Sequence, residues 1–142
     1  MDNTLLPFLI GILVVGGLLA FVIMITAKRG IGHKALKVDK YRTRWMTIEQ
    51  GLSRDEPSSH LLAILNADKL LDEALREKGI VGETMGARMK SQQKTWSNAN
   101  ALWGAHKLRN QIAHDHDIKV SYDDARRALA AFKRALKDVG AI

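Results

Sequence analysis

The stretch LLAILNADKLLDEALREKG, residues 61–79, decides the fold. Its apolar side chains fall on one broad face when the chain is wound at 3.6 residues per turn, which predicts an amphipathic helix. These apolar residues are Leu61, Ile64, Leu65, Leu71 and Leu75. Lys78-Gly79 is typical of a helix end, because glycine adopts the left-handed conformation that closes a helix. A helix of this kind must bury its apolar face against other elements.

Helical spacing also occurs on both sides of this stretch. A stripe with spacings of three and four predicts a helix over residues 38–52, followed by a polar turn around Pro57. Further helices are predicted over residues 84–92, 97–113 and 122–139. The first stripe consists of Val38, Tyr41, Trp45, Ile48 and Leu52, and the seam of the 97–113 helix consists of Ala101, Ala105, Leu108 and Ile112. No segment alternates with period two, so an all-α bundle of four to five helices is predicted.

Three residues mark predicted helix ends. Thr84 and Ser121 carry hydroxyl oxygens that accept hydrogen bonds from free backbone N–H groups, so each is a predicted N-cap. Gly140 is the predicted end of the last helix.

An uncharged, mostly apolar run extends from Asn3 to Ala27. As a helix, residues 5–27 would be about 34 Å long, enough for a hydrocarbon layer of about 30 Å. The chain starts Met1-Asp2, without the basic residues of a signal peptide. The run therefore predicts a single transmembrane helix ahead of the bundle.

Basic residues follow this run at once. Residues 28–44 contain seven Lys and Arg residues against Asp39 alone, whereas residues 1–27 contain none. Because basic flanks stay in the cytoplasm, we expect a single-pass protein of the cell membrane with its N-terminus outside and its C-terminal domain cytoplasmic. The same bases predict attraction to anionic lipid.

These patterns divide the chain into three parts. Residues 1–27 are the predicted anchor, residues 28–56 a basic juxtamembrane amphipathic helix, and residues 57–142 the bundle. Of the net charge of +7, residues 28–44 carry +6 (seven bases, one acid), whereas residues 45–142 carry +2 (15 bases, 13 acids) and Asp2 carries −1. The chain has no cysteine, which excludes disulfides and thiolate metal sites.

The candidate site lies in the predicted helix that ends near His114. Asn110 and His114 are four residues apart and therefore stacked on one face, with Arg109 beside them. Arginine binds phosphate oxygens in a bidentate way, and histidine transfers protons near neutral pH. A structural interpretation remains open, in which His114 caps the helix and Arg109 pairs with Asp68 or Asp72.

Two other features contain residue types that can bind a metal ion or nucleic-acid bases. The loop His114-Asp115-His116-Asp117 has alternating metal-ligand types, but it lacks an evident third fixed ligand, so no metal or other cofactor is predicted. Trp96 and Trp103 could stack on bases, but packing in the core or in a dimer is the favoured interpretation.

The stretch HKLRNQIAHD, residues 106–115, resembles the signature of the HEPN superfamily of nucleotide-binding helical domains. That signature is an arginine, a polar residue, three to five further residues and a histidine, which Arg109, Asn110 and His114 match. The preceding helix over residues 67–75 and the closing helix also resemble this family. The resemblance covers residues 57–139.

This resemblance implies a homodimeric bundle in which two Arg/His motifs meet and cut RNA without metal, as in defence or toxin–antitoxin systems. It implies that Arg109 holds the scissile phosphate, that His114 serves in acid–base chemistry, and that Asn110 orients either of them. The 2′-hydroxyl is the implied nucleophile. The alternative is a non-catalytic dimeric module that scaffolds a protein partner at the cytoplasmic membrane face, which the near-neutral charge of residues 45–142 favours.

Overall fold

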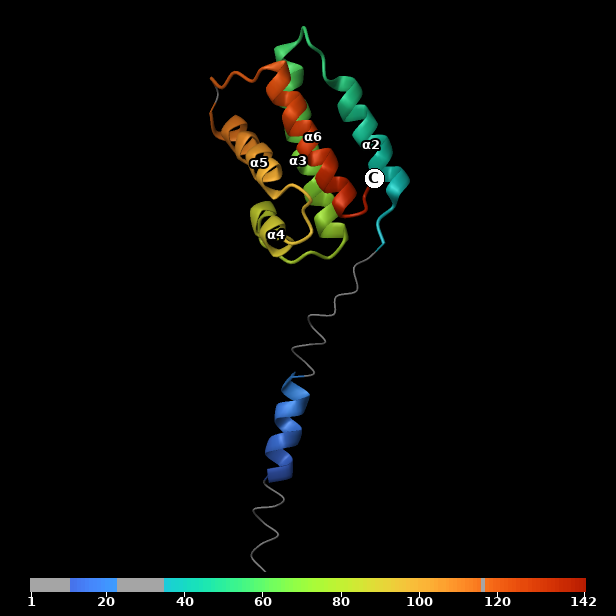
Figure 1. Ribbon diagram of the computed structural model, residues 1–142, viewed down its shortest axis with the longest axis vertical. Coiled ribbons are helices and arrows are strands. Elements are labelled where there is room, and N and C mark those ends of the chain that lie inside the picture. The colour runs from blue at the N-terminus through green and yellow to red at the C-terminus, as the bar shows by residue number, and fades with distance from the viewer. Residues whose placement is uncertain (1–10, 23–34, 116) are drawn as a thin grey trace, which may run out of the picture. The chain divides into compact units, whose positions relative to one another are not determined.

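The computed structural model describes residues 11–22, 35–115 and 117–142 (Figure 1). The chain divides into two compact units, Met1–Gly32 and His33–Ile142.

The predicted membrane anchor is the main correction to the sequence analysis. Among the described residues, no helix is long and apolar enough to cross a membrane. In the first unit the described residues 11–22 are helical, and this helix does not meet the requirement of a membrane span. This contradicts the predicted transmembrane helix and the single-pass localisation derived from it. Residues 3–10 and 23–34, on which those predictions also relied, lie outside the described residues.

The second unit is all-α, and its described residues contain no strand. Its helices are α2 (Val38–Gly51), α3 (Pro57–Glu77), α4 (Met85–Ser91), α5 (Ala99–His114) and α6 (Tyr122–Asp138). The predicted helical bundle is therefore confirmed. The boundary predicted between residues 56 and 57 remains a prediction.

The start of α3 differs from the predicted polar turn. The helix begins at Pro57, inside the segment that the sequence suggested was a turn. Proline is well suited to the first helical position, because that position needs no backbone N–H and its fixed φ is already helical. The extra turn brings Ser59 and His60 into the buried face of α3.

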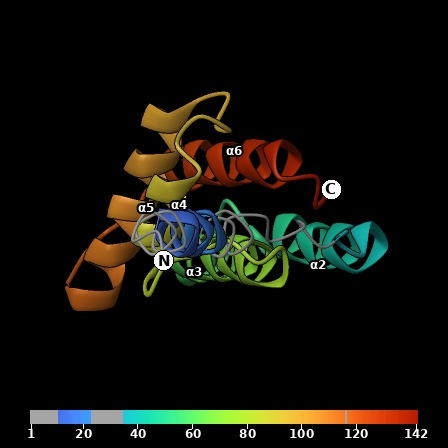
Figure 2. The same cartoon turned by 90° about the horizontal axis from the view of Figure 1, so that it is seen from below.

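Helix α3 lies at the centre of the bundle. It packs against α2, α4, α5 and α6 (Figures 1 and 2). Most of its apolar face is buried, and Leu61 and Leu65 are partly buried, which fulfils the requirement that residues 61–79 impose. The largest side chains of α3 in the core are Ile64, Leu70, Leu71 and Leu75. Phe132 and Leu136 of α6 and Leu102 of α5 complete this core.

The predicted helix ends are confirmed. Gly79 has a φ of +82°, and the N–H of Ile80 donates to the carbonyl of Leu75 at 2.9 Å. Gly140 has a φ of +74° after α6 and is followed by the same kind of bond. A glycine is needed at both points because L side chains rarely adopt positive φ. Thr84 and Ser121 cap α4 and α6 through their hydroxyl oxygens.

His60 ties two loops to α3. The side chain is buried, with Nδ1 3.0 Å from the Val120 carbonyl oxygen and Nε2 2.8 Å from the Ser53 carbonyl oxygen. Val120 lies in the connection between α5 and α6, so this contact fixes the chain that leaves the end of α5. The connection between α5 and α6 is therefore anchored at Val120, close to the start of α6.

Helix α2 is held on α3 by apolar packing and by charge. Tyr41 and Trp45 of the predicted stripe are buried. The Tyr41 hydroxyl donates to Glu77 at 2.7 Å, and burial together with this carboxylate raises the pKa of Tyr41. One turn further along, the Arg44 guanidinium makes a two-point contact with Glu73. The α2–α3 interface thus places charged pairs along the edge of an apolar seam.

We expect Glu73→Gln to weaken this interface in a pH-dependent way. The hydrogen bond from Arg44 holds the pKa of the Glu73 carboxyl below its ordinary value of 4.5. A group whose pKa is lower in the folded state stabilises the fold above its unfolded pKa, and this contribution is lost as the pH falls through the folded pKa. Because both side chains are partly exposed, the variant should lose only about 0.5–1 kcal/mol of unfolding free energy at neutral pH.

Urea unfolding of the wild type and the variant across the acidic range measures this effect. The difference between them should shrink towards zero as the pH is lowered below the ordinary Glu pKa. Glu83→Gln is the matched control, because Glu83 is exposed and has no ion-pair partner among the described residues. A difference between wild type and Glu73→Gln that stays constant with pH would contradict the assignment.

Candidate functional site

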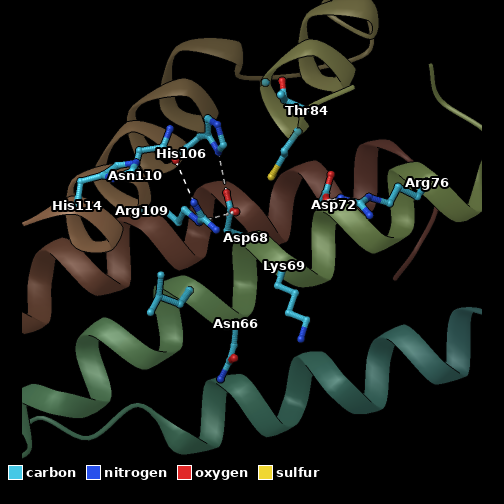
Figure 3. Close-up of a pocket in the computed structure, with 13 residues that line it drawn as sticks. Asn66, Asp68, Lys69, Asp72, Arg76, Thr84, His106, Arg109, Asn110 and His114 are labelled. Atoms are coloured by element: carbon cyan, nitrogen blue, oxygen red, sulfur yellow. Dashed lines mark hydrogen bonds and ion pairs between the residues drawn. The ribbon is translucent and has the colours of Figure 1, made fainter. Parts of the chain in front are cut away.

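A cleft of about 690 Å³ lies between α3, α5 and the start of α4 (Figure 3). Helix α3 supplies one wall and α5 the other. All three residues predicted from the sequence line this cleft. Its chemically active side chains are Asp68, Lys69, His106, Arg109, Asn110 and His114. The tertiary structure therefore adds groups from α3 to the residues that the α5 sequence indicated.

The Asp68 carboxylate joins the two walls. It is only 3% exposed, because it lies on the face of α3 that carries the core residues. One oxygen lies 2.8 Å from Nδ1 of His106. The other lies 3.1 Å from Nε of Arg109. A buried carboxylate is costly unless it is paired, and these two contacts meet that requirement.

Arg109 is held on two sides and open on a third. The contact from Nε to Asp68 is an ion pair without hydrogen-bond alignment, because that N–H finds no acceptor in line. Nη1 donates to the Asn110 side-chain oxygen at 3.1 Å. Nη2 has no partner among the described residues, and 36% of the side chain is exposed to solvent. The guanidinium therefore keeps donor capacity on the cleft side.

The pairing of Arg109 confirms one of the two ion pairs that the sequence analysis left open. Asp68 is the partner, and Asp72 is not. Asp72 instead pairs with Arg88 of α4 at 2.5 Å and with Arg76 at 2.8 Å. Arg88 is almost fully buried and also donates to the Gly82 carbonyl. This second cluster fastens α4 onto α3 and so fixes the rim of the cleft.

His114 is placed differently from the other two predicted residues. It is the last residue of α5, where a cation faces the negative end of the helix dipole. It is exposed and makes no hydrogen bond or ion pair with a described residue. Figure 3 shows it at the outer end of α5, whereas His106 and Arg109 turn towards Asp68. His114 is thus available to a ligand but is not held by a partner.

The buried face of α5 differs from the predicted seam at one position. Ala101 is exposed and Leu102 is buried, whereas Ala105 is buried as predicted and Leu108 and Ile112 pack partly buried against the core. Leu102 is the larger apolar residue, and burying it removes more apolar surface from water. His106 and Arg109, four and seven residues after Leu102, lie on the same side of the helix and meet Asp68 of α3.

Sequence analysis missed the role of His106 and its contact with Asp68, although it named Asp68 as a possible partner of Arg109. One signal was available, since Asp68 is a charged residue on the apolar face of the stretch 61–79. A second was the spacing of three residues between His106 and Arg109, which puts both on one helix face. Neither signal indicates which side chain lies opposite His106, so its contact with Asp68 was not predicted.

The structure also describes the two tryptophans and most of the loop with alternating metal-ligand types. Trp96 is buried and donates from Nε1 to the Met89 carbonyl, which confirms core packing, and Trp103 packs partly buried against the core. Within the described part of the chain, no group of three His, Asp or Glu residues is arranged to hold a metal ion. His116, one of the residues weighed for such a site, lies outside the described residues.

No protein-family model, curated protein or solved structure matches this chain. The HEPN resemblance therefore remains a prediction that rests on the residues of α5 and on the order of the helices. Function has to be inferred from the chemistry of the cleft.

We expect Arg109→Ala to destabilise the fold, because it leaves the buried Asp68 carboxylate with one partner instead of two. The loss should be about 1–3 kcal/mol of unfolding free energy, as for other buried charged groups that lose a partner. Arg76→Ala is the matched control, since Arg76 also pairs with an aspartate of α3 but is 65% exposed. Its loss should stay within about 0.5 kcal/mol. Equal stability of the two variants in urea unfolding would show that the Asp68 pair contributes little.

Proposed function

We propose that residues 57–142 form a HEPN-like domain that cleaves RNA without a metal ion. The proposed site is the cleft between α3 and α5, with Arg109, Asn110 and His114 as its working residues. The observation that carries this proposal is that all three line one open cleft. An ion-paired arginine with unused donors, beside an amide and an exposed imidazole, suits a phosphodiester better than an apolar ligand.

Each of these residues has its own role in the proposed cleavage of RNA. Arg109 binds a nonbridging phosphate oxygen through Nη2 and stabilises the charge that develops on phosphorus. Asn110 holds the guanidinium through its side-chain oxygen. The 2′-oxygen of the RNA attacks phosphorus while its proton is removed, and the bond from phosphorus to the 5′-oxygen breaks. His114 gives a proton to that departing oxygen. The products are a 2′,3′-cyclic phosphate and a 5′-hydroxyl.

The second candidate is a non-catalytic dimeric module that binds a protein partner. The observation that favours it is the pairing of Arg109 with the buried Asp68, which gives the arginine a structural task in the absence of any substrate. The charge balance of residues 45–142, +2 from 15 bases and 13 acids, also provides little general attraction for RNA.

The proposed activity predicts that the purified chain cleaves single-stranded RNA in the presence of EDTA. His114→Ala should slow cleavage by about 100-fold or more, as expected for loss of a proton-transfer group. Its melting temperature should change little, because His114 is exposed and unpaired among the described residues. RNA with a 2′-deoxy nucleotide at the cut site should resist cleavage. Mass spectrometry of the products should reveal the cyclic phosphate ends.

Lys107→Ala serves as the matched control, because Lys107 is an exposed base of α5 that does not line the cleft. It should cleave like the wild type. Cleavage of DNA, or RNA cleavage that survives His114→Ala, would reject this mechanism. Absence of RNA cleavage by the wild type would leave the interaction module as the better account.

The homodimer implied by the resemblance is part of the same proposal. Leu62 is 59% exposed and Met46 is 50% exposed. Leu62 lies one turn before Leu65 and Asn66, which line the cleft. An exposed apolar surface beside the cleft is a suitable place for a second copy to bind, because burying it removes apolar area from water.

We expect a fragment of residues 33–142, which is the second compact unit, to form dimers at micromolar concentration. Leu62→Asp should shift it towards the monomer, because a buried unpaired carboxylate is costly. Val81→Asp is the control, since Val81 is also exposed, at 69%, but follows the C-terminal end of α3, whereas Leu62 lies near its N-terminal end. Sedimentation equilibrium measures the shift. A wild-type fragment that sediments as a monomer at high micromolar concentration would contradict the dimer.

A further inference from the structure

We infer that His106 accepts the proton of the RNA 2′-hydroxyl and that Asp68 positions it for that task. This assignment rests on the proposed function and deepens it, since it supplies the base that Arg109, Asn110 and His114 leave unassigned. It also gives the buried carboxylate of α3 a role beyond packing.

The tautomer of His106 follows from its partner. Nδ1 lies 2.8 Å from Oδ1 of Asp68, and an ionised carboxylate only accepts hydrogen bonds. Nδ1 therefore carries the hydrogen of the neutral ring, and Nε2 carries a free lone pair. Asp68 is itself fixed by burial and by Arg109 at its other oxygen. A carboxylate held in this way keeps an imidazole in one orientation and stabilises the cation that forms when the ring takes a proton.

The free nitrogen of His106 faces the cleft beside α4. Gly86 and His106 both line the cleft, and a Cβ atom built on Gly86 would lie in van der Waals contact with Nε2, at 3.7 Å, so Nε2 lies beside the start of α4. Trp103 also packs here: its ring meets His106 edge to face with centroids 6.1 Å apart, and it lies 3.8 Å from the same Cβ position on Gly86. The imidazole is only 12% exposed, so its orientation is set by packing as well as by Asp68.

The two histidines of the cleft lie on either side of Arg109 along α5. His106 precedes Arg109 by three residues and His114 follows it by five, so their backbones are about 12 Å apart along the helix axis. A phosphate bound to the guanidinium would lie between the two rings. In an in-line displacement the attacking and departing oxygens are on opposite sides of phosphorus, and each needs its own proton-transfer group. The arrangement supplies one for each side.

Both imidazoles exchange a proton with the RNA during cleavage. The lone pair on Nε2 takes the proton of the 2′-hydroxyl as the 2′-oxygen bonds to phosphorus. The bond between phosphorus and the 5′-oxygen breaks, and the departing oxygen receives the proton of His114. His106 then releases its proton to water and His114 regains one from water, so both rings return to their starting states.

The test compares His106→Asn with the wild type as full chains, on single-stranded RNA in EDTA. Asparagine places an amide nitrogen near the position of Nδ1, so it still donates to Asp68 but takes no proton. We expect cleavage to fall by about 100-fold. The acidic limb of the rate–pH profile, which reports the unprotonated base, should disappear. Lys107→Ala should retain both the wild-type rate and this limb.

Asp68→Asn tests the positioning role. The amide no longer requires the hydrogen on Nδ1, so the acidic limb should move to a different pH and the rate should fall. A merely structural role for Asp68 would lower the melting temperature without moving that limb. The rate–pH profile of the residual activity therefore distinguishes a positioning role of Asp68 from a structural one, even where the variant is less stable.

The outcomes separate this inference from the proposed function. A wild type that does not cleave RNA overturns both. A wild type that cleaves, with a His106→Asn variant that keeps its rate and its acidic limb, overturns only the role of His106. If His106→Asn folds poorly, His106→Ala with added imidazole replaces it. Restored cleavage supports the base assignment, whereas a folded variant that imidazole does not restore contradicts it.

Discussion

The buried carboxylate of Asp68 is the interaction on which the site depends. It lies on the central helix, where an unpaired charge would cost several kcal/mol. Its two partners, His106 and Arg109, come from α5, so satisfying this one charge fixes how α5 docks on α3. The same contacts that stabilise the buried charge also orient an imidazole and a guanidinium towards one cleft.

A second aspartate one turn further along α3 performs a parallel task. Asp72 pairs with the buried Arg88 and thereby holds α4 against α3. The two aspartates are four residues apart, and each fastens a different helix. The cleft lies where these helices meet. The two aspartates of α3 therefore position both α4 and α5 around it.

The sequence predicted the helices well because local signals decide them. Apolar spacing identified the long helix of residues 61–79, and Gly79 and Gly140 marked helix ends at positive φ. The apolar run near the N-terminus was misjudged. Its hydropathy met the requirement of a membrane span, but among the described residues no helix is long and apolar enough to cross a membrane.

The sequence by itself determined an all-α chain and a helix end carrying Arg109, Asn110 and His114. Only the tertiary structure decided that Asp68 of α3 meets His106 and Arg109 of α5, 38 and 41 residues further along the chain. The docking of α5 on α3 and α6 is the physical reason. Burial of Leu102 and Ala105 sets which face of α5 turns inward, and that depends on the volume available against α3 and α6.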